Sequence, residues 1–368
     1  MRRSTRLAAL LTAGILALAT TACGDDEDPK DEPTTGSDPT TSESTDAPAP
    51  ESDIKVGMAY DVGGRGDQSF NDSAAAGLDQ AVEEFGVGSE ESEAGDGEAE
   101  TAREERLRTF ADAGFNPVIA VGFAYSASVA KVAAEYPDLS FAIIDDTASC
   151  EPFDGSDPIP NVACLVFAEE QGSFLVGAAA ALKSEAGHIG FVGGVQVPLI
   201  EKFQAGYEAG AKAVNPDITI DVQYLTQPPD FSGFGDPAKG KTAAEGMYQN
   251  GADIVYHAAG GSGGGVFEAA SEAGAKAIGV DSDQYNTADP SVQDVIMTSM
   301  LKNVNVAVYE YLSEVAGGTF PTGTNVYDLS VDGVGYSTSG GQVDDIVADL
   351  DAFKEQIISG EVEVPTAP

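Results

Sequence analysis

The sequence is poor in the residues that metal, thiol and hydrolytic chemistry require. Its 368 residues include no tryptophan, two histidines and three cysteines, without a Cys-x-x-Cys pair. Zinc binding and thiol redox chemistry are therefore not expected. Both histidines, His188 and His257, lie in apolar runs, where packing is their commoner role. Neither a Gly-x-Ser-x-Gly elbow nor the Ser, His and Asp spacing of a hydrolase occurs, so we expect no catalytic residue, metal or cofactor.

Basic residues are also scarce. Lys and Arg number 18 against 61 Asp and Glu, which leaves a formal net charge of −43 at pH 7. Charge of this sign opposes binding to nucleic acid and to anionic lipid surfaces. It also disfavours phosphorylated ligands unless local bases compensate. We therefore expect no nucleic-acid partner.

The N-terminus has the pattern of a lipoprotein signal peptide. Three arginines precede an apolar stretch, Leu7–Ala19, which is shorter than the roughly 20 residues that a transmembrane helix needs. The sequence T-T-A-C follows and places a small residue before Cys23. We expect residues 1–22 to be removed and Cys23 to carry a lipid that anchors the protein to the outer face of a bacterial cell membrane. The alternative is an ordinary signal peptide with an incidental cysteine, because Thr20 stands where Leu is commoner.

Residues 23–53 form a segment of different composition. They are rich in Pro, Thr, Ser and acids and contain a single base, Lys30. Such a segment cannot bury enough apolar surface to fold, so we expect a disordered tether between the anchor and the folded part. Cys150 and Cys164 can pair outside the cytoplasm across a Pro- and Gly-rich loop, which would contribute about 3 kcal/mol. Two reduced thiols in the core are the alternative.

The remainder of the chain alternates between apolar strand runs and helix-like runs. Continuous apolar strands separated by helices predict an α/β fold with parallel sheets covered on both faces. Several of the strand runs end in Gly or Asp and pass into polar turns, and ligands of open α/β sheets bind at such carboxyl ends. The strand runs are 55–60, 117–122, 140–145, 161–167, 188–193, 218–225, 252–258, 276–281, 295–300 and 325–330.

The most informative turn is residues 61–71, D-V-G-G-R-G-D-Q-S-F-N, between the first strand run and a helical run at 73–85. Its three glycines let the backbone bend sharply and approach a ligand closely. Phe70 stands among acids and amides, where a loop would not normally place a large ring. The combination indicates a pocket for a flat, hydroxyl-rich molecule.

Two glycine-rich segments imitate nucleotide motifs. Gly235–Thr242 reads G-D-P-A-K-G-K-T and matches the P-loop pattern. A true P-loop follows its strand directly, whereas here P-P-D-F-S-G-F intervenes and Pro237 removes a backbone donor. We expect a loop and a helix start, with Lys239 and Lys241 facing solvent or pairing with acids. Gly260–Gly265 lacks G-x-G-x-x-G spacing; we interpret it as a close backbone approach to a small ligand, with a plain flexible turn as the alternative.

Seven motifs occur in an order typical of one family. They are D-x-G…D-x-S-F-N (61–71), V-G-F (121–123), F-A-I-I-D (141–145), G-D-P-A-K-G-K (235–241), A-A-G-G-S-G (258–263), G-V-D-S-D-Q (279–284) and S-M-L-K-N-V (299–304). Over 54–335 the chain resembles the basic membrane protein family of lipoproteins, which includes PnrA-like purine nucleoside receptors. The resemblance implies a type I periplasmic-binding-protein fold, with two Rossmann-like lobes and a ligand cleft between them. It further implies a purine nucleoside ligand, an ABC transporter permease as partner and no enzymatic activity; we expect a monomer.

The resemblance also implies which residues contact the base. Phe70 and Phe234 would sandwich it, with Phe231 as a competitor for the second position. Asn71 and Asp145 would hydrogen-bond its edge. As alternatives, the two rings could be core residues, and Asn71 could cap the helix that begins nearby.

The ribose would be held by Gly260, Asp281 and Lys302, and Asp61 and Asp67 match the motif of the first loop. A carboxylate that accepts two ribose hydroxyls would also repel a phosphate, which favours a nucleoside over a nucleotide. Alternatively, Asp281 could cap the following turn, and Lys302 could be a solvated helix residue.

We expect the first lobe at 54–168 and 283–318, and the second at 169–282 and 319–362. The segment 86–105 is rich in Gly and Glu where a strand is expected, so the second strand of the first lobe stays open. Other functions also stay open: a receptor of the same fold for a sugar or another small polar metabolite, an ATPase or nucleoside hydrolase, and a surface protein without a transport role. Two rings that face each other across the cleft would favour a base, and one ring among acids and amides would favour a sugar.

Overall fold

The computed structural model describes residues 52–368 except 96 and 153. The predicted signal peptide, Cys23 and all but the end of the predicted tether lie outside these residues. No helix in the described part of the chain has the length and apolar character needed to cross a membrane.

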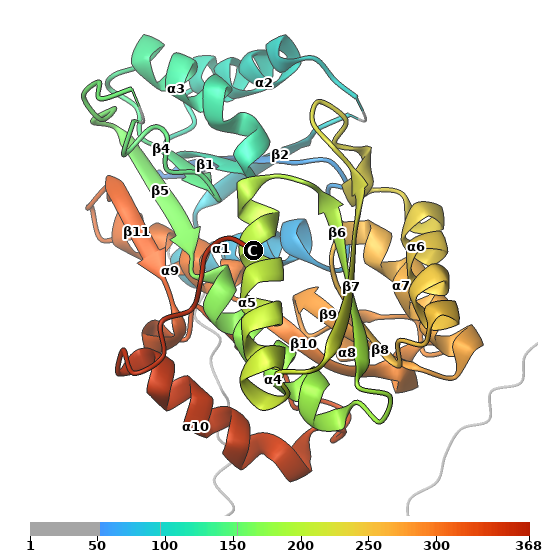
Figure 1. Cartoon of the computed structure of the whole chain (residues 1–368). Helices are drawn as coiled ribbons and strands as arrows, with labels where there is room; N and C mark the ends of the chain where they lie inside the picture. The colour runs from blue at the N-terminus through green and yellow to red at the C-terminus, as the bar shows by residue number, and fades with distance from the viewer. Residues whose placement is uncertain (1–51, 96, 153) are drawn as a thin grey trace, which may run out of the picture. The chain divides into compact units, whose positions relative to one another are not determined.

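Twelve strands in the described part form two six-stranded sheets (Figure 1). The first sheet has the order β11-β5-β4-β3-β1-β2, with every pair parallel. Its strands are β1 (Lys55–Tyr60), β2 (Gly88–Glu93), β3 (Val118–Val121), β4 (Phe141–Ile144), β5 (Val162–Phe167) and β11 (Gly323–Tyr327). The second sheet has the order β12-β10-β9-β8-β6-β7, parallel except for β10 with β12. Its strands are β6 (His188–Val195), β7 (Thr219–Thr226), β8 (Ile254–Ala258), β9 (Lys276–Asp281), β10 (Ile296–Lys302) and β12 (Val334–Tyr336).

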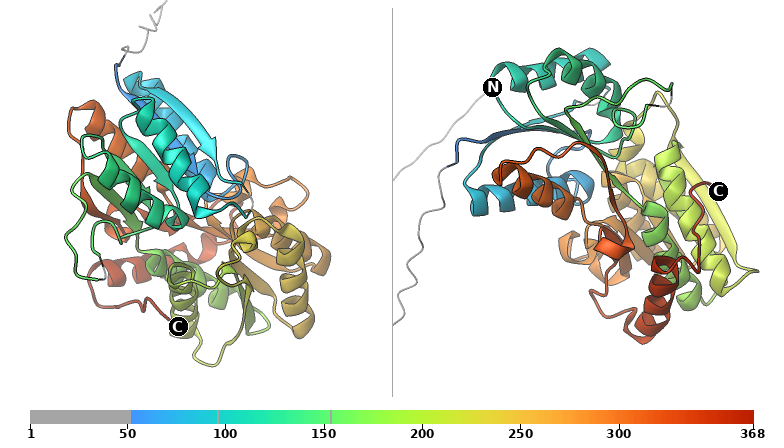
Figure 2. Two further views of the ribbon diagram at one scale, coloured as in Figure 1. Left: turned by 90° about the horizontal axis from the view of Figure 1, so that it is seen from above. Right: turned by 90° about the vertical axis from the view of Figure 1, so that its left-hand side faces the viewer.

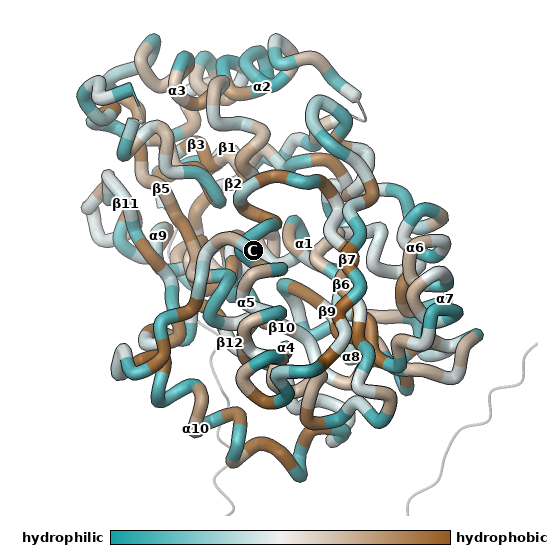
Figure 3. Tube along the Cα trace, in the orientation of Figure 1, coloured by the Kyte–Doolittle hydropathy of each residue, from teal (hydrophilic) through white to brown (hydrophobic). Residues whose placement is uncertain are grey.

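Helices cover both faces of each sheet, which explains why the inner strands are apolar along their whole length. In the first lobe, α2 and α3 pack on one face, and α1 and α9 pack on the other (Figure 2). In the second lobe, α6 and α7 pack on one face and α4 and α5 on the other. The helices are α1 (Phe70–Phe85), α2 (Glu100–Asp112), α3 (Ser126–Glu135), α4 (Glu169–Lys183), α5 (Pro198–Val214), α6 (Pro237–Asn250), α7 (Gly263–Ala273), α8 (Gln284–Thr287), α9 (Val304–Ala316) and α10 (Val347–Ile358). Figure 3 shows the apolar strands between more polar helices.

The predicted lobe boundaries are wrong at two strands. β10 lies within 283–318 but pairs with β9 in the second sheet, and β11 lies within 319–362 but pairs with β5 in the first. Only α9 of the 283–318 segment joins the first lobe, where it packs on α1. The chain therefore passes between the sheets after β5, after β10 and after β11. Strand alternation gives no information on which sheet accepts a strand, because both sheets offer an equally apolar neighbour.

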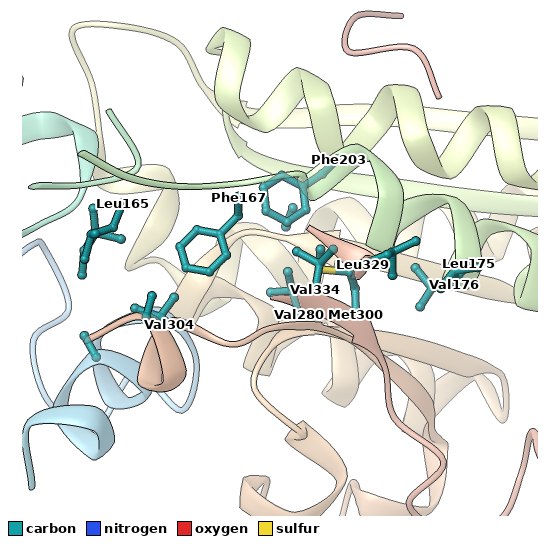
Figure 4. Close-up of a cluster of buried hydrophobic side chains, with 14 of the residues drawn as sticks. Leu165, Phe167, Leu175, Val176, Phe203, Val280, Met300, Val304, Leu329 and Val334 are labelled. Carbon is teal, nitrogen blue, oxygen red and sulfur yellow. The ribbon is translucent and has the colours of Figure 1, made fainter. Parts of the chain in front are cut away.

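The crossing segments share one buried apolar cluster (Figure 4). Phe167 of β5, Met300 of β10 and Val304 of α9 belong to it, and Phe203 of α5 points toward them. Packing of this kind spans both lobes, so the crossings form part of the core and not a loose linker.

The glutamate-rich segment of the first lobe does form a strand. β2 pairs with β1 at the edge of the sheet and leaves most of its side chains exposed. Edge strands of natural proteins often carry charge, which discourages pairing with other chains. Glu91 accepts hydrogen bonds from Tyr60 Oη and from Arg65 Nε, each at 2.6 Å, which ties the strand to the first loop. The predicted disulfide between Cys150 and Cys164 is confirmed.

Candidate ligand-binding cleft

A cavity lies where the carboxyl ends of the two sheets meet. Its empty volume is about 620 Å³ including the open mouth, within the range of about 300–1,000 Å³ typical of small-molecule sites. Segments from both lobes line it. All nine residues predicted for the ligand site are among the lining residues: Asp61, Asp67, Phe70, Asn71, Asp145, Phe234, Gly260, Asp281 and Lys302.

The first loop is held in shape by two of these predicted residues. Asp67 accepts hydrogen bonds from the backbone N–H groups of Ser69, Asn71 and Asp72 at 2.9–3.1 Å, and so caps the start of α1. The Asn71 side chain accepts from Asp61 N at 3.1 Å and donates to Asp67 Oδ2 at 3.1 Å. The alternative that Asn71 is the cap is wrong, because the capping carboxylate belongs to Asp67. The network presents Phe70, the first residue of α1, to the cavity.

Lys302 lines the cavity and is buried. Its Nζ is 2.6 Å from Asp145 Oδ2 and 3.1 Å from Glu169 Oε1. The same ammonium group is 5.1 Å from the ring centres of Phe70 and Phe167 and 5.6 Å from that of Phe203, as in cation–π contacts. The alternative of a solvated helix residue is wrong, because Lys302 ends β10 and is enclosed.

Two opposing effects set the protonation of Lys302: burial disfavours its positive charge, and the neighbouring carboxylates favour it. Burial opposes the charged ammonium, but the carboxylates of Asp145, Glu169 and Asp281 outweigh it and hold the pKa of Lys302 above its usual value. Burial raises the pKa of Asp145, and the neighbouring Lys302 opposes that rise. The lysine therefore remains protonated and carries the positive charge of the site.

Asp145 and Asp281 occupy corresponding places in the two sheets. Asp145 follows β4 and Asp281 ends β9, the third strand from one edge of each sheet, and both adopt left-handed backbone conformations with φ of 70° and 62°. Asp281 Oδ2 accepts a hydrogen bond from Ser69 Oγ at 2.6 Å, whereas Asp145 Oδ1 is buried without a hydrogen-bond partner. Burial raises the pKa of Asp281 to about 6 and that of Asp61 to about 6. An unpaired buried oxygen in a cavity wall is a place where a ligand donor would be stabilising.

Aromatic side chains come to the cavity from both lobes. Phe70 belongs to the first, and Phe234 belongs to a short 3₁₀ helix, Ser232–Phe234, of the second. The Phe234 ring packs over Gly194, where a Cβ atom would lie 2.5 Å from the ring. Phe231, the competing candidate, is not a lining residue of the described cavity and instead packs edge-on against Phe123, with ring centres 5.9 Å apart.

Several lining residues were not among the nine predicted ligand contacts. They include Phe123 and three apolar residues from the first turns of α5: Leu199, Ile200 and Phe203. The V-G-F motif offered a signal for Phe123, since it follows β3 directly. The start of α5 offered none, because an apolar helix turn that faces a cavity has the same sequence pattern as one that faces the core.

The two glycine-rich segments that resemble nucleotide-binding motifs have different places in the structure. Gly235–Thr242 begins α6, where Asp236 accepts from Lys239 N at 3.1 Å. Lys239 pairs with Asp236 and Lys241 with Glu272, at 3.3 and 2.7 Å, as the structural interpretation predicted. Gly260, in contrast, lines the cavity at the carboxyl end of β8. Among the described residues, no cluster of three or more His, Cys, Asp or Glu side chains could hold a metal ion.

Comparison with known proteins agrees with the geometry of the cleft. Residues 54–367 match the family described as ABC transporter substrate-binding protein PnrA-like. The chain is 34% identical to the CD4+ T-cell-stimulating antigen of Listeria monocytogenes, over 86% of this chain and 89% of that protein. It is 32% identical to the ABC transporter nucleoside-binding protein BmpA of Lactococcus lactis, over 85% of this chain and 90% of that protein. A solute-binding protein of an ABC transporter system from Aeropyrum pernix has a TM-score of 0.71 at 30% identity, covering 85% of this chain and 93% of that one.

The motif resemblance and the predicted fold class are confirmed by these matches and by the two parallel sheets. The chain belongs to the PnrA-like family of ABC transporter substrate-binding proteins.

Proposed function

We propose that the protein captures purine nucleosides outside the cytoplasm and delivers them to an ABC permease without changing them chemically. The observation that carries this proposal is a single cavity in which rings from both lobes stand beside buried carboxylates and one buried lysine. The flat base would lie between Phe70 and Phe234, and stacking contributes about 1–3 kcal/mol per base in other proteins.

The polar groups of the cavity suit the edge of the base and the hydroxyls of the ribose. Asp145 has a free buried oxygen for a donor on the base edge, and Asn71 also lines the cavity. Asp281 and Lys302, with the backbone at Gly260, would bind the ribose hydroxyls. Asp61 and Asp67 hold the first loop and add negative charge, so a phosphorylated ligand would be disfavoured. The Lactococcus relative is named a nucleoside-binding protein, which supports the same ligand class.

The remaining parts of the proposal concern the setting of the receptor. We infer a lipid on Cys23 that anchors the chain to the membrane, with the acidic segment up to 53 as the tether. A monomer would meet the permease after its lobes close on the ligand. Mass spectrometry of the membrane-extracted protein, before and after Cys23→Ala, tests the anchor: the lipid mass should be absent from the variant.

Calorimetric titration of the full chain tests the ligand class. Guanosine, inosine, adenosine, their monophosphates, free bases and sugars form the panel, preceded by mass spectrometry of any co-purified small molecule. We expect binding of purine nucleosides and no detectable binding of the monophosphates, since the cavity is lined by buried acids. Incubated nucleosides should release no free base. Binding of a sugar with silence for every nucleoside would contradict the proposal.

A further inference from the structure

The two lobes are joined by hydrogen bonds beside the cavity that involve residues outside its lining. Ser282 Oγ donates to the backbone oxygen of Ser69 at 3.0 Å, and Gln284 Nε2 donates to the backbone oxygen of Gln68 at 3.0 Å. Gln68 and Ser69 belong to the first loop, whereas Ser282 and Gln284 follow β9 of the second lobe. We call these four residues the polar latch. Neither Ser282 nor Gln284 lines the cavity.

Gln284 is held firmly on its own side. It is 3% exposed, its Oε1 accepts from Val280 N at 2.9 Å, and its backbone N donates to Ser299 Oγ at 3.1 Å. The side chain packs on Gly279, where a Cβ atom would lie 2.7 Å from Oε1. Because the side chain is already fixed, its Nε2 group can donate to the first lobe with little additional loss of side-chain entropy.

The latch residue Gln68 of the first lobe has an unusual backbone conformation. Gln68 has φ of 53°, a left-handed conformation that costs a non-glycine residue free energy unless surrounding contacts hold it. In this conformation its carbonyl accepts from Gln284, and the next carbonyl accepts from Ser282. Two successive carbonyls of one turn are thus satisfied by the opposite lobe.

The latch adjoins the candidate ligand contacts on both sides. Ser69 precedes Phe70, and Ser282 follows Asp281. Ser69 is fully buried, and its Oγ donates to Asp281 Oδ2 at 2.6 Å. Any motion that separates Ser282 from Ser69 therefore also separates Asp281 from Phe70, so formation of the latch assembles the cavity.

We propose that Ser282 and Gln284 are positioning residues: their hydrogen bonds to the first loop set the fraction of protein in which the lobes are closed. A ligand that binds only the closed form has an apparent affinity reduced by the closed fraction. Loss of one hydrogen bond of ordinary net strength should shift the closing equilibrium about fivefold toward the open form. The effect on opening needs no ligand, whereas the effect on ligand release rests on the proposed function.

Hydrogen exchange of the ligand-free full chain tests the latch. Ser282→Ala removes one interlobe donor, and Gln284→Glu keeps the acceptor for Val280 N but replaces the donor with an oxygen. Ser359→Ala is the matched control, because its hydroxyl donates to a backbone carbonyl, that of Gln356, within the last turn of α10. Peptides that cover 62–71 and 280–287 should exchange about fivefold faster in Ser282→Ala, and at least as much faster in Gln284→Glu, but not in the control.

A second measurement separates this proposal from the proposed function. If guanosine binds, its dissociation from Ser282→Ala should be about fivefold faster than from the control, while the melting temperature falls by no more than about 4 °C. If no nucleoside binds the unaltered protein, the proposed function is contradicted. The latch is then still tested by hydrogen exchange, which needs no ligand. Exchange in 62–71 and 280–287 that is the same in both latch variants and the unaltered protein would overturn the latch.

Discussion

At the scale of single residues, Lys302 organises the cleft. Its ammonium group pairs with Asp145 and Glu169 and lies within 5.6 Å of three ring centres. Glu169 also pairs with Lys202 at 3.1 Å, so a chain of alternating charges leads from the cavity toward α5. Each member reduces the cost of burying its neighbours, and removal of one would leave the others uncompensated.

The stacking hypothesis makes the first prediction. Phe70→Ala should weaken nucleoside binding more than tenfold, because a stacked ring contributes about 1–3 kcal/mol. Phe320→Ala is the control, since that ring is 39% exposed and lies outside the described cavity. Calorimetry measures affinity, and thermal unfolding verifies that both variants fold. An unchanged affinity in Phe70→Ala would remove this ring from the binding site.

The buried acid at the end of β9 makes the second prediction. Burial raises the pKa of Asp281 from 3.8 to about 6, so the folded protein holds this proton more tightly than the unfolded chain. As pH rises from about 4 to about 6, the unfolded chain ionises first, and the free energy of unfolding falls by about 3 kcal/mol. Asp281→Asn should lack this part of the decrease. Denaturant unfolding of both proteins at pH 4 and pH 7 measures it; parallel pH profiles would contradict the assignment.

At the scale of elements, close packing of α4 against α5 brings the first turns of α5 to the cavity. Glycines make the approach possible: a Cβ atom at Gly210 would lie 1.9 Å from Phe174 O, and one at Gly206 would lie 2.1 Å from Glu170 O. Side chains at these positions would force the two helices apart. The position of α5 in turn determines where Ile200 and Phe203 meet the cavity.

Helix separation makes the third prediction. Gly210→Ala should destabilise the protein by about 1–3 kcal/mol, or more, because the added methyl group meets backbone atoms that cannot move aside. Gly246→Ala in α6 is the matched control, since nothing lies within 4 Å of its added Cβ. That change should stabilise the protein by about 0.5–1 kcal/mol through helix propensity. Denaturant unfolding measures both values, and equal effects would refute the packing argument.

At the scale of the whole molecule, the two sheets repeat one plan. The orders β11-β5-β4-β3-β1-β2 and β12-β10-β9-β8-β6-β7 match position for position, and they differ in direction only at the edge, where β11 is parallel to β5 but β12 is antiparallel to β10. Asp145 and Asp281 therefore stand at equivalent ends, as do Gly122 after β3 and Gly260 after β8, and all four line the cavity. The repeat is not evident in the sequence, because equivalent strands share only their apolar character.

The acidic composition makes the fourth prediction. Most of the net charge of −43 lies on the folded part of the chain, which therefore repels itself more strongly than the expanded unfolded chain does. Raising NaCl from 0.1 M to 1 M shortens the screening distance from about 10 Å to about 3 Å. The thermal midpoint should therefore rise by about 5 °C. A midpoint that falls with NaCl would show that ion pairs, which salt also screens, contribute more than the net repulsion.

Much of the fold and the position of the cleft could be predicted, because both depend on local sequence patterns such as apolar strands and the residues that end them. Apolar strands that end in Gly or Asp indicated parallel sheets with a site at their carboxyl ends, and two cysteines around one loop favoured a disulfide over two reduced thiols. The individual ligand contacts were implied by the family resemblance. Ile200 and Phe203 were missed because an apolar helix turn has no sequence mark of the surface it faces. The β10 and β11 assignments failed because strand pairing depends on which sheet edge remains free.

The sequence by itself determined the kind of elements, their order and the chemical types available at each strand end, since these depend on periodicity and on residues near one another in the chain. The tertiary structure alone decided which lobe each late strand joins, that Lys302 is enclosed between two acids and three rings, and that Ser282 and Gln284 meet the first loop. Lys302 meets Asp145 across 157 residues of chain, and Gln284 meets Gln68 across 216. A pairing at that distance is chosen by the packing of the whole chain.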